Sequence, residues 1–452
     1  MRLGFSLLTT ALATAGCGGS DIDPGDPGDP GDPVEPGDVT GLASSAGSSR
    51  VEPVPGCPGD NGGITLPPGF CASVFADNLG RARHMAVTPS GDVFVVIDPP
   101  PGATEPSHVV ALRDADHDGA AEITQIVADD GGNGIAWVDG MLYVAPDDRI
   151  VRYALSDGDL VPTRGPEVVV SGLPGTGDHH RKTIVPIGGQ LYVNIGSASN
   201  ACQVENRVPH SPGIDPCPEL CERAGVWRFS MAYLGQSMTS GHRVATGVRN
   251  ANALGANARG ELWAAPNGRD QLHDNWPELF TLEQDMRLPS EEIFAIREGA
   301  DHGWPYCYHD PVRDQMMLAP EYGGDGTIVG RCANVATPAL SMPAHWAPLG
   351  LTFYDGTQFP ESFRGGAFIA NHGSRFDVNG VGDPGYNVVF VPFTGDAPSG
   401  SWETFATGFT GGGLPLPDAA RHRPVGLAVM PDGALLISDD KGGRIWKVTY
   451  QQ

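Results

Sequence analysis

The stretch HMAVTPSGDVFVV, residues 84–96, holds two apolar runs of strand length that are joined by a tight turn with glycine at position 91. Both runs are rich in residues that favour strands, and glycine in the turn accommodates a positive φ angle. The stretch therefore predicts a β-hairpin, with both strands buried on at least one face.

The same pattern returns along the rest of the chain. Copies are GIAWVDGMLYVA (134–145), TIVPIGGQLYVN (183–194), ALGANARGELWAA (253–265) and VGLAVMPDGALLIS (425–438), and in a weaker copy, FRGGAFIA (363–370), only the second run is clear. The predicted turn glycines are Gly91, Gly140, Gly189, Gly260, Gly366 and Gly433. A hairpin repeat of this kind is typical of radial architectures, because one blade cannot bury both of its faces alone.

We therefore predict an all-β fold, a six-bladed β-propeller over residues 64–452. A strand within residues 64–79 is expected to pair with the run at 443–450 and close the ring. A β-sandwich is the alternative, but so regular a hairpin repeat does not favour it.

Residues 1–17 have the features of a lipoprotein signal peptide. Arg2 precedes a short apolar run, and the run ends at TAGC with Cys17 as the acylated residue, although Thr14 stands where Leu is usual. The alternative is an ordinary secretory signal with an incidental cysteine. Residues 18–63 contain the acidic repeat DPGDPGDPG (23–31) and predict a disordered linker. The expected location is the bacterial cell envelope, on the outer membrane facing the periplasm or the cell surface, with membrane contact through the lipid anchor only.

The formal net charge of −26 argues against nucleic acid as a partner, because an acidic surface repels phosphate backbones. Disulfides are expected in an exported chain. With Cys17 set aside, the predicted pairs are 307–332, 57–71, and 202 with 217 or 221, which leaves one free thiol, Cys217 or Cys221. No Cys-x-x-Cys-His motif is present, so no covalent haem is expected.

Polar residues gather just before the first strand of the hairpins. They are Arg83-His84, Asn133, Asp178-His179, Arg249-Asn250 and Arg421-His422-Arg423. Equivalent positions of a propeller lie on one face, so these side chains are expected to converge at one mouth of the central channel. Arginines that converge need an anion between them, and guanidinium groups suit a bound carboxylate. The alternative for each residue alone is a solvated loop charge.

Two further motifs remain open. Residues 114–119, DADHDG, resemble the start of a calcium loop, but Gln125 stands where such loops carry a bidentate Glu, so a plain acidic turn is an equal alternative. Residues 303–307, GWPYC, could line a sugar site or pack a blade, and packing is favoured.

The chain resembles the sorbosone dehydrogenase and soluble glucose dehydrogenase family. The resemblance rests on segments at 178–179, 247–250 (GVRN), 260–270 (GELWAAPNGRD), 303–307, 372–374 (HGS) and 423–426 (RPVG). Those enzymes are six-bladed propellers that use pyrroloquinoline quinone (PQQ) and calcium. The resemblance implies the same fold and cofactors here, with a small-molecule sugar as the substrate.

The resemblance also implies roles for single residues. His179 matches the catalytic histidine, Asp178 the acid before it, and Arg249 a catalytic group beside the quinone. The cofactor-binding positions would be His179, Arg249, Asn250, His372, Arg421, Arg423 and Asn133, and calcium would be held by the backbone carbonyls of Gly268 and Arg269. A cofactor-binding lysine is absent near His372, and Gly132 replaces a glutamine beside Asn133. These departures place the chain nearer the sorbosone or pyranose branch.

The expected activity is oxidation of an aldose, sorbosone or related pyranose. His179 would take the hydroxyl proton, hydride would pass to the quinone, and Arg249 with calcium would stabilise the developing negative charge. Electrons would leave to a separate cytochrome or quinone. The alternatives are a non-catalytic propeller that binds a glycan or protein, and a calcium-dependent hydrolase such as a lactonase.

Overall fold

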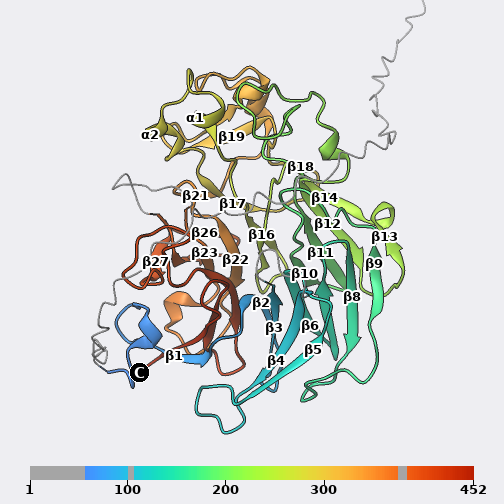
Figure 1. Ribbon diagram of the computed structural model, residues 1–452, viewed down its shortest axis with the longest axis vertical. Coiled ribbons are helices and arrows are strands. Elements are labelled where there is room, and N and C mark those ends of the chain that lie inside the picture. The colour runs from blue at the N-terminus through green and yellow to red at the C-terminus, as the bar shows by residue number, and fades with distance from the viewer. Residues whose placement is uncertain (1–55, 100–105, 375–383, 452) are drawn as a thin grey trace, which may run out of the picture. The chain divides into compact units, whose positions relative to one another are not determined.

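The computed structural model describes residues 56–99, 106–374 and 384–451 (Figure 1). The predicted signal peptide and most of the predicted linker lie outside these residues. The described part is mostly β, and its six large sheets confirm the six-bladed propeller. Within the described residues no helix is long and apolar enough to cross a membrane.

Each blade is one antiparallel sheet of four strands, extended in two blades by a short parallel strand. The first three blades are β2 (Arg81–Val87), β3 (Val93–Asp98), β4 (His108–Arg113) and β5 (Ile123–Ala128); β6 (Gly134–Val138), β7 (Met141–Ala145), β8 (Arg149–Ala154) and β9 (Glu167–Ser171) with β13 (Gln236–Ser237); and β10 (Ile184–Ile187), β11 (Gln190–Ile195), β12 (Gly225–Ser230) and β14 (His242–Thr246) with β18 (Ala300–Asp301).

The remaining blades are β15 (Ala253–Ala256), β16 (Leu262–Ala265), β17 (Glu291–Ala295) and β21 (Leu340–Met342); β22 (Pro348–Phe353), β23 (Ala367–Asn371), β24 (Asn387–Val391) and β27 (Glu403–Ala406); and β28 (Pro424–Val429), β29 (Leu435–Asp439), β30 (Ile445–Tyr450) and β1 (Phe70–Ala76). A small hairpin, β25 (Phe393–Thr394) with β26 (Ala397–Pro398), follows β24. Short 3₁₀ turns lie at Asn61–Gly63, Pro218–Cys221, Met238–Ser240, Pro320–Tyr322, Gly330–Asn334 and Glu361–Phe363.

The six innermost strands form the ring. Strands β2, β6, β10, β15, β22 and β28 contact one another in this order, and β28 contacts β2. Apolar side chains of neighbouring blades fill the space between the sheets, as where Phe94 and Val96 of one blade pack with Leu142 and Val144 of the next. The core therefore runs around the ring between blades and leaves the strand ends free for polar residues.

The ring is closed between the two ends of the propeller sequence. Strand β1 pairs antiparallel with β30, with Phe70 opposite Tyr450. This pairing confirms the strand predicted within residues 64–79 and its partner at 443–450.

The fifth blade departs from the predicted hairpin. Its first strand, β22, is separated from β23 by residues 354–366, so no tight turn connects them. The prediction of Gly366 as the turn glycine is wrong: Gly365 has the positive φ, 76°. Gly366 is required for space instead, because a Cβ there would lie 2.3 Å from the Phe390 ring. The other predicted turn glycines have φ between 76° and 92°.

A lobe stands beyond the ends of β16 and β17 (Figure 1). It contains α1 (Leu272–Asn275), α2 (Leu282–Asp285) and the hairpin of β19 (Cys307–Asp310) with β20 (Gln315–Leu318). Its own apolar cluster includes Leu272, Phe280 and Met317. The lobe lies on the polar end of the ring and contributes side chains to the site described below.

Three disulfides are present, Cys57–Cys71, Cys202–Cys217 and Cys307–Cys332. They confirm the predicted pairs and assign Cys217 as the partner of Cys202. The predicted free thiol is wrong, because Cys221 is disulfide-bonded too and no described cysteine is free.

Candidate active site

The candidate site follows from the antiparallel pairing of the two inner strands of each blade. The first residue of β6 lies opposite the last of β7, and the same holds for β15 with β16 and β28 with β29. Residues before the first strand and after the second strand therefore meet at one mouth of the ring. The polar positions predicted from the sequence belong mainly to the first group.

A buried carboxylate, Asp440, lies just after β29 and organises one side of the mouth. Arg83 donates to Asp440 over 2.7 Å, and His372 donates through Nε2 over 2.7 Å. Burial opposes ionisation of Asp440, but His372, Arg83 and Arg81 hold the pKa of this carboxyl well below its usual range. Burial and nearby Arg423 lower the pKa of His372 to about 4. A neutral imidazole thus donates to a charged carboxylate.

Hydrogen bonds continue from this carboxylate around the mouth. Arg83 Nε donates to Asn133 Oδ1 over 3.1 Å, and Asn133 Nδ2 donates to Thr183 Oγ1 over 3.0 Å. The Thr183 hydroxyl in turn donates to the Asn252 carbonyl over 2.9 Å. The network crosses four blades and ends two residues from Asn250, so Arg83 and Asn133 converge with the segment that carries Asn250.

Arg423 and Arg421, predicted as a pair, are separated. The Arg423 guanidinium donates to the carbonyls of His372 (2.9 Å) and Gly373 (3.0 Å) and lies 5.6 Å from the Tyr386 ring centre. Arg421 is exposed and its side chain packs against Gly411. No hydrogen bond or ion pair joins Arg421 to the site within the described residues.

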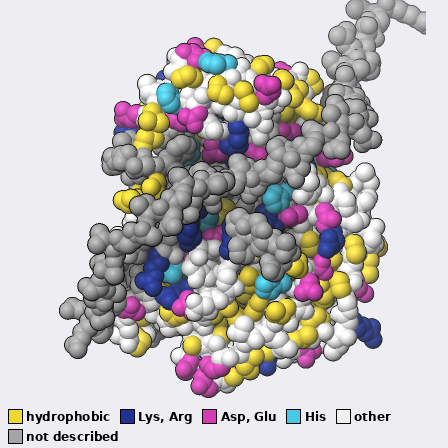
Figure 2. Space-filling view, in the orientation of Figure 1, with side chains coloured by type: hydrophobic (Ala, Val, Ile, Leu, Met, Phe, Trp, Pro, Cys, Tyr) yellow, Lys and Arg dark blue, Asp and Glu magenta, His cyan; other side chains and the backbone are white. Residues whose placement is uncertain are grey.

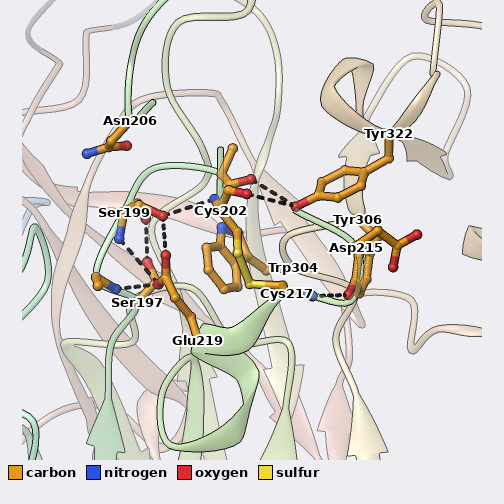
Figure 3. The surroundings of a disulfide bond; sticks show 12 residues. Ser197, Ser199, Cys202, Asn206, Asp215, Cys217, Glu219, Trp304, Tyr306 and Tyr322 are labelled. Atoms are coloured by element: carbon orange, nitrogen blue, oxygen red, sulfur yellow. Dashed lines mark hydrogen bonds between the residues drawn. A yellow bond between two sulfur atoms is a disulfide. The ribbon is translucent and has the colours of Figure 1, made fainter. Parts of the chain in front are cut away.

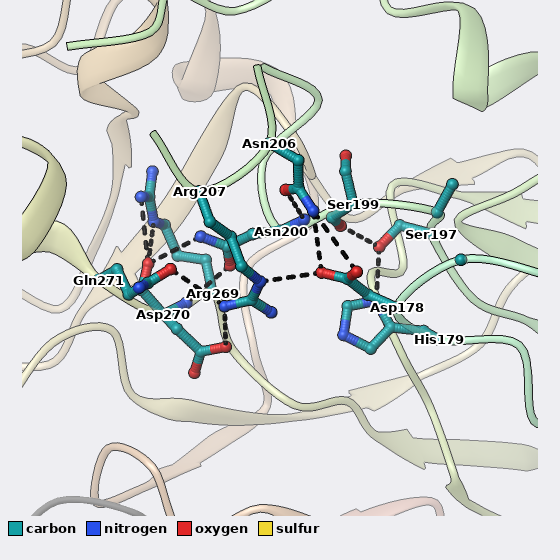
Figure 4. A network of polar contacts seen from close by, with 12 residues as sticks. Asp178, His179, Ser197, Ser199, Asn200, Asn206, Arg207, Arg269, Asp270 and Gln271 are labelled. Carbon is teal, nitrogen blue, oxygen red and sulfur yellow. Dashed lines mark hydrogen bonds and ion pairs between the residues drawn. The ribbon is translucent and has the colours of Figure 1, made fainter. Parts of the chain in front are cut away.

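His179 lies on the other side of the mouth, in the loop before β10. Its Nδ1 is 2.8 Å from Ser197 Oγ, and no described residue bonds its Nε2 (Figure 4). Burial, reinforced by the charge of Arg249, lowers the pKa of His179 well below its usual value. At neutral pH the imidazole is therefore uncharged and can accept a proton.

The carboxylate of Asp178 turns away from this imidazole. It accepts from Arg207 Nε over 2.9 Å and from Asn206 Nδ2 over 3.2 Å (Figure 4). Arg207 reaches on to Asp270, 3.3 Å away. The side chain that contacts His179 Nδ1 is therefore Ser197 and not Asp178.

Arg249 is buried and held in a fixed orientation. Its guanidinium donates to Asn200 Oδ1 (2.9 Å), to Asp270 Oδ2 (3.1 Å) and to the Gly268 carbonyl (2.7 Å). Burial opposes ionisation of Asp270, but Arg249 and Arg207 hold its pKa well below the usual range. Arg249 therefore presents a preorganised positive charge beside His179.

The predicted calcium position conflicts with this geometry. Calcium bound at the Gly268 carbonyl would lie close to the Arg249 guanidinium that already donates to that oxygen, and the two positive charges would repel. The Arg269 side chain forms an ion pair with Glu321. In this arrangement the predicted carbonyls do not fit calcium.

Several polar groups at the mouth lack partners among the described residues. They include the side-chain oxygens of Asn250 and Asn252 and the amide nitrogen of Asn194, all buried. Unpaired buried polar groups are costly, and a polar ligand would satisfy them. The Asn194 amide would fit a quinone or carboxylate oxygen of PQQ, whereas the Asn250 and Asn252 oxygens require a hydrogen-bond donor.

The anions of the mouth were not among the residues predicted from the sequence. Asp98 ends β3, and Asp270 and Asp440 follow β16 and β29, the second strands of their hairpins. Asp98 accepts two hydrogen bonds from Arg181 Nη2, at 2.7 and 2.8 Å. The signal was an acidic residue directly after a buried strand, as in LLISD (435–439) followed by Asp440. These carboxylates supply the anions that the converging arginines required. Where described atoms are visible in Figure 2, basic, acidic and histidine side chains are accordingly interspersed.

The two open motifs have separate outcomes. The aromatic motif packs the fold: Trp304 is buried and donates to the Asn200 carbonyl, and Tyr306 accepts from the Cys217 amide. In the acidic loop the carboxylate oxygens of Asp114, Asp116, Asp118 and Glu122 lie within 4.8 Å of one another. Calcium binding by this loop stays a prediction.

Comparison with solved structures supports the fold assignment. A Trichoderma reesei protein of carbohydrate-active enzyme family AA12 is 20% identical with a TM-score of 0.69, covering 86% of this chain and 98% of that chain. The PQQ domain of a pyranose dehydrogenase from Coprinopsis cinerea is 19% identical with a TM-score of 0.69, covering 87% and 99%. The PQQ-bound aldose sugar dehydrogenase of Streptomyces coelicolor is 17% identical with a TM-score of 0.50, covering 85% and 99%.

At the sequence level, an uncharacterised protein of Borreliella burgdorferi is 29% identical over 264 residues, and the match spans 58% of this chain and 60% of that relative's length. Residues 64–451 match the TrAA12-like family, which is most of the chain. The chain therefore belongs to the TrAA12-like family.

Proposed function

We propose that the protein oxidises a sugar at the mouth of the propeller with PQQ as the electron acceptor. The observation that carries the proposal is the uncharged His179, with no described partner at Nε2, beside the fixed charge of Arg249. The relation to PQQ-dependent sugar oxidoreductases supports it. The substrate class proposed is an aldose, sorbosone or related pyranose.

The cofactor would be held by the polar groups that ring the mouth. Arg423, Asn250 and Asn133 lie on three different blades and offer cationic and amide donors to carboxylates and quinone oxygens. Asp440 and Asp270 already neutralise much of the arginine charge, so hydrogen bonding would matter as much as net charge. PQQ, when bound, supplies a two-electron acceptor for the hydride of the substrate carbon.

The residues of the chain would do the proton chemistry. His179 Nε2 would accept the proton of the sugar hydroxyl, since a base with a lowered pKa is uncharged at neutral pH. Arg249 would stabilise the negative charge that develops on the oxygen, and its three fixed contacts mean that it need not reorganise during the reaction. No step is assigned to calcium, because the predicted carbonyls do not fit it.

The proposal is tested by cofactor binding and turnover. Purified protein is titrated with PQQ by absorbance, and aldoses and sorbosone are then assayed with an artificial electron acceptor. His179→Gln should lower kcat by roughly 100- to 10,000-fold while PQQ affinity stays within about twofold. His180→Gln is the matched control, because among the described residues this neighbouring imidazole contacts only the Gly177 carbonyl and Asp147. It should retain full activity.

The pH dependence gives a second readout. The pKa of His179 lies below its usual value, so the acid limb of kcat/KM should fall below about pH 6.5. Absence of PQQ binding, or full activity of His179→Gln, would contradict the proposal. Glycan binding without turnover would instead support the non-catalytic alternative, and lactone hydrolysis the hydrolase.

Two features of the biological setting extend the proposal. Electrons would pass to a separate cytochrome or quinone, and the mature protein would be held on the cell envelope through a lipid on Cys17. The amino-terminal sequence supports the anchor. Lipid analysis of the mature protein and electron-acceptor assays with membranes test these two points.

A further inference from the structure

Two short segments beside the candidate base are clamped together. The Asp178 amide donates to the Ala198 carbonyl over 2.9 Å, and the His179 amide donates to the Ser197 carbonyl over 3.2 Å. Ser197 follows β11, the second strand of the same blade. The His179 imidazole and the Ser197 hydroxyl are therefore held next to each other by the backbone pairing as well as by the hydrogen bond between the two side chains.

The positions of the protons follow from the acceptors. Ser197 Oγ lies 2.7 Å from the Ser199 carbonyl oxygen, which can only accept, so the hydroxyl proton lies between these two oxygens. The opposite orientation would leave two acceptors facing each other at this distance. Ser197 Oγ must then accept from His179, which places the imidazole proton on Nδ1 and leaves the lone pair on Nε2.

A half-buried carboxylate, Glu219, holds this segment in place. Glu219 Oε2 accepts from the amides of Ala198 (2.6 Å) and Ser199 (3.3 Å), and its Oε1 accepts from the Ser199 hydroxyl (Figure 3). The Ser199 hydroxyl also accepts from the Cys202 amide over 2.9 Å. The Cys202–Cys217 disulfide ties the loop that carries Glu219 to this segment.

We propose that Ser197, held by Ser199 and Glu219, is the positioning residue that keeps the lone pair of His179 on Nε2, aimed at the substrate hydroxyl. The role in catalysis rests on the proposed function, whereas the tautomer of His179 follows from the geometry alone. A neutral serine orients the imidazole without adding negative charge beside it. A carboxylate at this position would orient the ring but also strengthen its affinity for a proton.

The tautomer is measured directly. Histidine-selective ¹⁵N labelling distinguishes protonated Nδ1 from protonated Nε2, and the His179 signals are assigned by their loss in His179→Gln. The protein without PQQ should show the Nδ1–H form, and Ser197→Ala should convert His179 to a mixture of tautomers. Ser197→Thr, which keeps the hydroxyl, should restore the Nδ1–H form.

The kinetic arm uses the same variants with PQQ and a sugar. Ser197→Ala should lower kcat at least roughly tenfold with little change in KM, and Ser197→Thr should recover most of the loss. Ser197→Asp should move the acid limb of kcat to higher pH, which a purely structural role would not do. The control is Ser290→Ala, which removes a matched 2.8 Å contact to the buried His309 and should leave the pH profile unchanged.

The outcomes separate the two proposals. An Nε2–H tautomer of His179 in the unaltered protein overturns the positioning role. In an active enzyme, an unchanged kcat in Ser197→Ala or an unchanged pH profile in Ser197→Asp also overturns it. If no sugar is oxidised but the Nδ1–H tautomer is present and depends on Ser197, the positioning geometry stands and the proposed function fails.

Discussion

At the scale of single residues, His302 shows how burial without a partner is tolerated. It is 3% exposed, its ring lies 4.3 Å from that of Phe294, and neither ring nitrogen bonds a described residue. It lines a cavity of about 30 Å³ with Glu292 and Asn267, whose side-chain oxygens are also unpaired. Such a volume suits one or two ordered waters.

Burial lowers the pKa of His302 to about 4. Between this value and the ordinary 6.5 the unfolded chain binds a proton that the folded chain does not, so His302 costs stability as pH falls through this window. Phenylalanine does not titrate, so His302→Phe removes this cost. The free energy of unfolding of the variant, relative to that of the unaltered protein, should therefore be about 1–2 kcal/mol higher at pH 5 than at pH 8. Urea unfolding at both pH values measures this difference. An equal effect at the two pH values would show that burial does not suppress protonation of His302.

His179 differs from His302 in the partners of its ring nitrogens. Both are uncharged at neutral pH, but His179 has Ser197 on one nitrogen and the mouth of the ring on the other. A lowered pKa therefore accompanies a proposed base at His179 and only a buried group at His302. Geometry at the ring nitrogens distinguishes them.

At the scale of elements, glycines allow the innermost strands to approach one another. Gly134, Gly255, Gly350 and Gly426 all lie on these strands, and a Cβ at any of them would meet the backbone of the next blade at 2.8 Å or less. At Gly350 the Val425 carbonyl oxygen would be 2.1 Å away. Because neighbouring backbone cannot rotate away as a side chain can, the spacing of the ring depends on these positions.

Gly350→Ala should destabilise the protein by about 1–3 kcal/mol, the usual cost of overpacking a core. Thermal unfolding monitored by circular dichroism measures the loss. Gly165→Ala is the control, since nothing lies within 4 Å of its added Cβ and its φ is not positive. Equal melting temperatures for the two variants would show that the ring accommodates the added Cβ without loss of stability.

At the scale of the whole molecule, the propeller is held closed by a strand from each end of its sequence. Phe70 of β1 is 4% exposed, and its ring lies 4.8–5.2 Å from those of Phe359, Phe363, Tyr450 and Phe405. These contacts join the closing strand to the fifth and sixth blades. The closure thus depends on aromatic packing as well as on the β1–β30 ladder.

Phe70→Ala should lower the free energy of unfolding by about 3–5 kcal/mol, because a large side chain is removed from a packed cluster. Equilibrium unfolding in guanidinium chloride measures the change. Tyr233→Ala, which removes an aromatic side chain that is 68% exposed, should have little effect. Equal free energies of unfolding for the two variants would show that the backbone pairing of β1 with β30 alone stabilises the closed ring.

The sequence by itself determined the architecture and part of the site. Hairpins are local, so five of the six could be found from apolar runs and a turn glycine, and the closing strand and two disulfide pairs followed. Only the second strand of the fifth blade was predicted, because residues 354–366 separate β22 from β23 and no tight turn joins them. His179, Arg249 and Asn133 could be found because they precede first strands in a repeated register.

Tertiary structure decided the partners. Asp440 meets Arg83 only because the last blade closes against the first, a contact between residues 357 positions apart. Ser197 meets His179 because β11 returns beside β10, and the structure turns Arg421 to solvent while Arg423 binds carbonyls. A repeat fixes which positions share a face, since it is a property of local backbone. Which side chains pair on that face depends on the distances between blades, which exist only once the ring has closed.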